Sequence, residues 1–115
     1  MVVVAAIAAA GWYVLRPQAE TFGRYSTDVE TVSIGDLNET HLGHTVAIEG
    51  TIVTECPHSG CWAVIEDGTG QIRIDTQRGG FALPLHREGS RIRVVGELEQ
   101  IEGGALQISA DSAQL

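Results

Sequence analysis

Residues 61–76, CWAVIEDGTGQIRIDT, hold two short apolar runs on either side of Asp-Gly-Thr-Gly. An Asp-Gly segment between such runs is a strong hairpin signal, because glycine adopts the left-handed backbone that a tight turn needs. In the second run Ile72 and Ile74 alternate with polar residues, as in a half-buried strand. The stretch therefore predicts a β-hairpin with strands at 61–67 and 71–76.

Segments on both sides of this hairpin alternate with the same period of two. The segments are 44–55, 91–99 and 105–110. In the first of them Gly50 predicts a bend or bulge, which a curling strand needs. The hairpin and these segments give five strands.

The links between the strands differ in length. Residues 33–43 predict one or two helical turns before the first strand. Residues 77–90 contain Gly79, Gly80 and Pro84 and predict a long connection, with room for a helical turn around 81–85. A long bent strand, a hairpin, a longer link and a second hairpin form the strand pattern of the OB-fold, a five-stranded all-β barrel. A six-stranded sandwich fragment needs more strands than the chain offers.

The chain before the barrel divides into two parts. Residues 1–15 are uncharged and apolar and end in an aromatic pair followed by Arg16, as at a membrane–water boundary. As a helix they would reach about 22 Å, short of the roughly 30 Å hydrocarbon core. We therefore predict a membrane or signal anchor, or a cleaved signal segment, with a buried helix as the weaker alternative. Residues 16–32 predict a linker, and 33–115 the barrel domain.

Charge limits the partners that this domain can take. The formal net charge is −8, and the chain has no lysine. Such a balance argues against nucleic acid, whose binding proteins neutralise phosphates with basic side chains. We expect a domain outside the cytoplasm, anchored to the membrane through residues 1–15 or secreted, that binds an unidentified ligand or protein.

Both cysteines lie in the loop Cys56-Pro57-His58-Ser59-Gly60-Cys61, between the first two strands. A four-residue reversal can bring two cysteines within the Cα separation of a disulfide, which we predict for an oxidising compartment. A zinc or copper(I) site formed by Cys56, His58 and Cys61 is the main alternative, with His86, His44 or His41 as a further ligand. A thiol–disulfide redox role and two inert thiols also remain open.

Four residues form a second candidate site, for a ligand on the barrel surface. Trp62 either packs in the core or lies outside as a stacking platform, and the core is favoured for so large a side chain. Arg73, Arg91 and Arg93 lie on strands and would face a single-stranded nucleic acid if one bound. No catalytic motif is present, and we predict a non-catalytic module that needs no cofactor.

The order Gly-Cys-Trp, Glu-Asp-Gly, Ile-Arg-Ile and Phe-Ala-Leu-Pro, over about residues 44–98, resembles a family of small bacterial OB-fold domains, secreted or membrane-anchored. Members of that family carry a Cys-x4-Cys-Trp motif at the position of Cys56, Cys61 and Trp62. The resemblance implies the fold and the compartment. It implies no activity, because none is established for the family.

Overall fold

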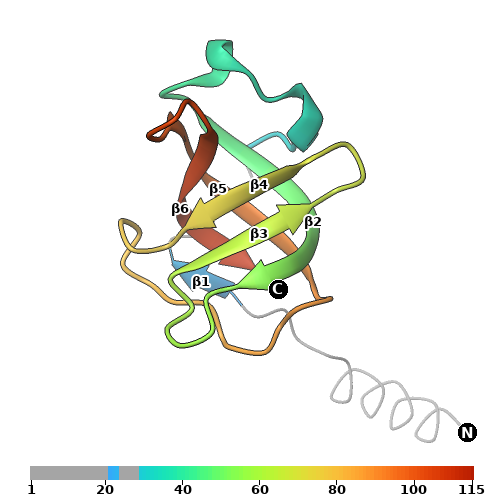
Figure 1. Cartoon of the computed structure of the whole chain (residues 1–115), viewed down its shortest axis with the longest axis vertical. Helices are drawn as coiled ribbons and strands as arrows, with labels where there is room; N and C mark the ends of the chain where they lie inside the picture. The colour runs from blue at the N-terminus through green and yellow to red at the C-terminus, as the bar shows by residue number, and fades with distance from the viewer. Residues whose placement is uncertain (1–20, 24–28) are drawn as a thin grey trace, which may run out of the picture.

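A computed structural model of the chain describes residues 21–23 and 29–115. Five strands form a closed barrel in this part of the chain (Figure 1). They are β2 (Thr45–Glu55), β3 (Trp62–Glu66), β4 (Gln71–Asp75), β5 (Arg91–Gln100) and β6 (Leu106–Gln114). The predicted five-stranded all-β barrel is confirmed. The predicted N-terminal helix and anchor, residues 1–15, lie outside the described residues.

The barrel closes through the pairing of β5 with both β2 and β6. Around the barrel the strands follow the order β2, β3, β4, β6, β5, and β5 pairs with β2 again. Neighbouring strands are antiparallel except β4 and β6, which are parallel. A parallel pair needs a crossover connection, and here the chain leaves β4, crosses to β5 and returns in β6.

Strand β2 belongs to both halves of the barrel because it bends. Its first part pairs with β5 and its last part with β3, and Thr51 pairs with both. At Gly50 a Cβ atom would lie 2.4 Å from the carbonyl oxygen of Glu66, so only glycine allows this approach. A β-bulge between Ile52 and Thr54 then shifts the register of β2 against β3. The bend predicted at Gly50 is present, and the bulge lies three residues further on.

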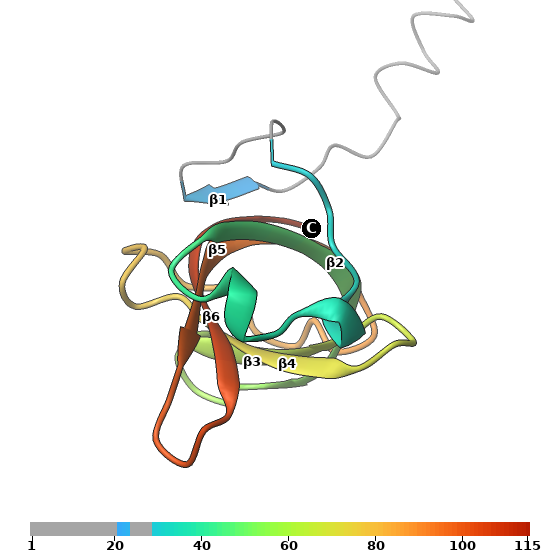
Figure 2. The same cartoon turned by 90° about the horizontal axis from the view of Figure 1, so that it is seen from above.

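Two 3-10 turns close one end of the barrel, as Figure 2 shows from above. They are η1 (Ile34–Asp36) and η2 (Glu39–His41), and they confirm the helical turns predicted between 33 and 43. Asp67, in the β3–β4 turn, accepts a hydrogen bond from the Ile34 N–H (2.8 Å). Thr69 in the same turn accepts one from the Gly35 N–H (2.9 Å). The hairpin turn therefore holds η1 over the barrel, with Ile34 buried in the core.

The core is aliphatic and has contributions from every barrel strand. Its fully buried large side chains include Ile48, Ile52, Ile65, Ile74, Leu98 and Ile108. These are the inward positions that alternation predicts, so the hydrophobic effect sets the register of the strands.

Part of the predicted linker contacts the barrel. Strand β1 (Thr21–Gly23) pairs with the second half of β6, beyond the point where β4 ends. A parallel bridge joins Thr31 to Ala47. Both contacts fall within 16–32, whose boundary with the barrel domain stays a prediction. Within residues 21–23 and 29–115, no helix is long and apolar enough to cross a membrane.

The connection between β4 and β5 has no helix, so the helical turn expected around 81–85 is wrong. Its backbone groups bond elsewhere: the Leu83 N–H donates to the Gly60 carbonyl (2.9 Å) and the Phe81 N–H to that of Thr76 (3.4 Å). Pro84 also has no N–H to donate. The connection is instead an irregular segment that packs against the loop between β2 and β3.

Candidate functional site

The loop between β2 and β3 is held in place by backbone hydrogen bonds at both ends. The Cys56 N–H donates to the Trp62 carbonyl (3.0 Å), and the Thr76 N–H donates to the Cys61 carbonyl (2.9 Å). Gly60 has φ of 62°, and a Cβ there would lie 2.0 Å from the Leu83 carbonyl oxygen. Glycine is therefore required at the point where the loop meets the β4–β5 connection.

The two cysteines of the loop are close neighbours but are not bonded. Their sulfur atoms lie 3.5 Å apart, and both are free thiols. The Ser59 hydroxyl lies 3.2 Å from the Cys56 sulfur. The chain therefore brings together the pair predicted to form a disulfide, and the bond itself stays a prediction for the oxidised protein.

Hydrogen bonds lower the pKa of the Cys56 thiol to about 6. The largest contribution comes from the Ser59 side chain, followed by the backbone N–H groups of His58 and Ser59; burial opposes them. Donors directed at a sulfur favour its anion, and the thiolate is the nucleophilic form of cysteine. The lowered pKa therefore favours the thiolate form of Cys56.

A small pocket of about 120 Å³ lies beside Cys56. Its walls are Glu55, Cys56, Pro57, Leu85, His86 and Glu88. The carboxylate of Glu55 accepts a hydrogen bond from the Arg87 N–H (2.8 Å), which ties the end of β2 to the far wall of the pocket. His86 has a positive φ of 62°, unusual for a residue other than glycine. The pocket thus borders a cysteine that is only 8% exposed.

The predicted metal ligands Cys56, His58, Cys61 and His86 do not form a ligand set. Among the described residues, no group of three or more His, Cys, Asp or Glu side chains could hold a metal ion. His86 shares the pocket with Cys56, whereas His58 is exposed and does not line it. His41 accepts a hydrogen bond from the Asn38 N–H (3.2 Å) and serves as part of a helix cap. The metal-site prediction for these residues is therefore not supported by the geometry.

Trp62 lies on the outer face of the barrel, so the prediction that favoured the core is wrong. It is partly buried, like Val64, whereas its neighbours Ala63 and Ile65 point inward and are fully buried. The Arg73 guanidinium lies over the indole, 5.2 Å from the ring centre. The outer face of β3 and β4 thus carries an aromatic ring and a cation beside the end of the cysteine loop.

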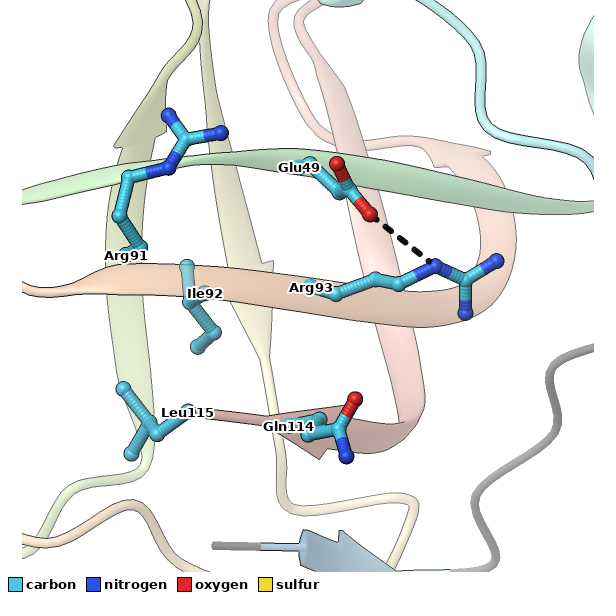
Figure 3. Close-up of a pocket in the computed structure, with 6 residues that line it drawn as sticks. All are labelled: Glu49, Arg91, Ile92, Arg93, Gln114 and Leu115. Atoms are coloured by element: carbon cyan, nitrogen blue, oxygen red, sulfur yellow. Dashed lines mark ion pairs between the residues drawn. The ribbon is translucent and has the colours of Figure 1, made fainter. Parts of the chain in front are cut away.

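Arg91 and Arg93 lie on β5, separated by β2 from Trp62. They line a different pocket, of about 250 Å³, with Glu49, Ile92, Gln114 and Leu115. Figure 3 shows Arg93 paired with Glu49 (3.5 Å) and Arg91 pointing elsewhere. Arg93 also donates to the Val29 carbonyl (2.6 Å). The four residues predicted for a nucleic-acid surface are therefore split between two faces.

The site also contains Ser59, Glu55 and Glu88, which were not predicted from the sequence. The inward position of Glu55 could not be predicted from alternation, because the bulge after Ile52 exchanges the inward and outward positions of β2. Glu55 therefore pairs with inward-facing Ala63 and is buried, while Thr54 is exposed. The role of Ser59 could have been predicted from its position, because a hydroxyl three residues after a cysteine in a tight turn can reach the cysteine sulfur.

Comparison with known proteins informs the fold alone. No family model matches the sequence, and no curated protein matches it. A solved structure described as the hypothetical protein ygiW from E. coli is similar, with a TM-score of 0.52 and 20% sequence identity. The match covers 82% of this chain and 97% of that one. The chain therefore shares its β-barrel architecture with that protein, and its resemblance to domains with a Cys-x4-Cys-Trp motif stays a prediction.

Proposed function

We propose that the barrel is a non-catalytic OB-fold binding module that holds its ligand on the outer face of β3 and β4. The strand order and the parallel pairing of β4 with β6 support the OB assignment. In OB-folds, the face formed by the second and third barrel strands binds oligosaccharides and oligonucleotides. Those strands are β3 and β4 here.

The observation that carries the proposal is the Trp62–Arg73 pair on this face. An indole held on an outer strand face offers a flat apolar surface against which a sugar or base can stack. Arg73 is exposed, so its guanidinium can turn aside and donate hydrogen bonds to the ligand. Glu66 and Asp75, on the same two strands, supply carboxylate acceptors.

The ligand that suits this face best is an uncharged oligosaccharide. A sugar stacks its apolar face on the indole, while its hydroxyl groups pair with both the guanidinium and the carboxylates. The formal charge of −8 opposes a polyanion. Single-stranded nucleic acid is the alternative ligand, and it would need Arg91 and Arg93 on a face that Trp62 does not share.

A fluorescence titration of the full chain tests the proposal. A panel of neutral oligosaccharides and an oligothymidylate are added at low and at moderate salt. Saturable, salt-independent binding of an oligosaccharide, lost in Trp62→Ala and weakened in Arg73→Ala but not in Arg91→Ala, supports it. Binding of the oligothymidylate alone, weakened by salt and by Arg91→Ala, supports the nucleic-acid alternative. Binding of neither class contradicts the assignment of this face.

The proposed compartment is outside the cytoplasm, with residues 1–15 as an anchor or signal segment. The apolar, uncharged composition of this segment supports the proposal. A fusion of the chain to a reporter enzyme that is active only after export tests it. An inactive reporter with normal protein levels contradicts it.

A further inference from the structure

We propose that Cys56 and Cys61 form a redox-active dithiol that exchanges with small disulfides, with Cys56 as the attacking thiol and Cys61 as the resolving one. This site goes beyond the proposed ligand face, which needs no thiol chemistry. It would give the molecule, in addition to ligand binding, a stoichiometric reaction at the loop next to Trp62.

The first support is the separation of the two sulfurs. At 3.5 Å the thiols are in contact, so a bond between them needs only a small movement of the side chains. The loop that carries them is already held at Gly60 and Cys61 by hydrogen bonds to Leu83 and Thr76. A disulfide that closes so short a loop lowers the entropy of the unfolded chain only slightly, and stabilises the folded state by about 2 kcal/mol. The pair is therefore of limited use as a structural staple and is well placed for exchange.

The second support is the asymmetry between the two thiols. Cys56 has the Ser59 hydroxyl at 3.2 Å and the Cys61 thiol as neighbours that can donate to its sulfur, and it lines the pocket. The lowered pKa of Cys56 agrees with this arrangement. A thiolate with a pKa near the ambient pH combines ionisation with good nucleophilicity. The geometry therefore gives the two cysteines different tasks.

The reaction balances as a two-electron exchange. The Cys56 thiolate attacks one sulfur of the small disulfide, and the other sulfur leaves as a thiolate. Cys61 then loses its proton to solvent and attacks the Cys56 sulfur, and the second thiolate of the small molecule leaves. The protein dithiol is oxidised to a disulfide, and the small disulfide is reduced to two thiols.

The charges around the pocket determine which small disulfide molecules can approach Cys56. Glu55, His86 and Glu88 line the pocket, and the Cys61 thiol lies against the Cys56 sulfur in the loop. One carboxylate oxygen of Glu55 accepts a hydrogen bond from the Arg87 N–H. Like charges repel an anionic reagent from such a pocket. Cationic and neutral aliphatic disulfides therefore fit the site better than anionic ones.

The reduced full chain is tested with cystamine, hydroxyethyl disulfide and dithiodiglycolate as the cationic, neutral and anionic probes. Intact mass distinguishes the mixed disulfide from the bridge, which is lighter than the dithiol by two hydrogens. The expected result is rapid bridge formation, with cystamine reacting faster than dithiodiglycolate. Cys61→Ser stops at one mixed disulfide on Cys56. Cys56→Ser reacts more slowly at Cys61, by about tenfold.

Equal rates for the two single variants, or mixed disulfides that never resolve to the bridge in the unaltered chain, overturn the proposal. Stoichiometric zinc bound by the purified protein also overturns it in favour of a metal site. Glu88→Gln provides the charge test and should reduce the preference for cystamine severalfold, because Glu88 is exposed and lines the pocket. Its matched control is Glu39→Gln, an exposed residue in η2 at the opposite end of the barrel, which should leave the preference unchanged (Figure 1). None of these results depends on ligand binding at Trp62, so failure here leaves the proposed function to its own test.

Discussion

The Cys56 N–H donates a hydrogen bond to the Trp62 carbonyl at 3.0 Å, so the thiol loop and the first residue of β3 are joined through the backbone. Cys56 belongs to the dithiol beside the pocket. Trp62 places its aromatic ring on the outer face of the neighbouring strand. Because this hydrogen bond links the two backbones, a shift of the Cys56 backbone should also move the backbone of Trp62. Oxidation of the dithiol should therefore alter the fluorescence of Trp62.

Removal of the Ser59 hydroxyl should raise the pKa of the Cys56 thiol from about 6 toward its ordinary value. The hydroxyl stabilises the thiolate, so Ser59→Ala leaves less of the reactive anion at neutral pH. The rate of alkylation by iodoacetamide, followed against pH in a Cys61→Ser background, measures the shift. Ser33→Ala is the control, since that side chain makes no cap hydrogen bond. An unchanged midpoint in the Ser59 variant would show that another group ionises Cys56.

Gly60→Ala should destabilise the protein by about 2 kcal/mol or more, from the combined cost of the backbone conformation and of a clash. The added Cβ would lie 2.0 Å from the Leu83 carbonyl oxygen. Gly43→Ala is a matched control, because Gly43 also has a positive φ (78°) but nothing lies within 4 Å of the added atom. Urea denaturation gives both stabilities. Equal losses in the two variants would mean that the packing against Leu83 contributes nothing.

Asp67 should make stability depend on pH at the acid end. Burial raises the pKa of Asp67, but hydrogen bonds from the Thr69 side chain and the backbone N–H of Ile34 outweigh it, so the pKa lies below its usual value. The folded state then binds the proton more weakly than the unfolded chain does. The contribution is complete above the unfolded pKa of about 3.9 and is lost as pH falls through the folded value.

Asp67→Asn should therefore lower stability at neutral pH by about 1 kcal/mol and flatten its dependence on pH below 4. Thermal unfolding between acid and neutral pH provides the measurement. The exposed Asp111 on β6, changed to Asn, is the control and should leave the profile as it is. A profile of equal steepness in the Asp67 variant would assign the acid sensitivity to other carboxylates.

The barrel could be predicted because each strand obeys a local rule. Ile48, Ile72, Val94 and Ile108 recur at the period of a half-buried strand, and all are buried. Asp67 and Gly68 begin the turn in the place that turn chemistry requires. Local periodicity determines these features, so a single sequence is enough to predict them.

The site could be predicted only in part, because its geometry depends on contacts distant in sequence. The bulge after Ile52 turns Glu55 inward, where its carboxylate accepts a hydrogen bond from the N–H of Arg87, 32 residues later. The β4–β5 connection forms no helical turn because its Leu83 N–H donates to the Gly60 carbonyl in the β2–β3 loop. Trp62 lies outside because alternation with Ala63 and Ile65 outweighs the general tendency of tryptophan to be buried. The cysteine pair was predicted from its spacing, with free thiols as one of the alternatives, but its pocket was not predicted.

The most direct test of the binding face is a map of amide chemical shifts in the full chain. Its spectrum is recorded during titration with the neutral oligosaccharide that quenches fluorescence most strongly. The largest changes are expected at 61–65 and 72–76, on β3 and β4 around Trp62 and Arg73. Changes confined to β5 around Arg91 and Arg93, with β3 and β4 unaffected, would contradict the proposed binding face.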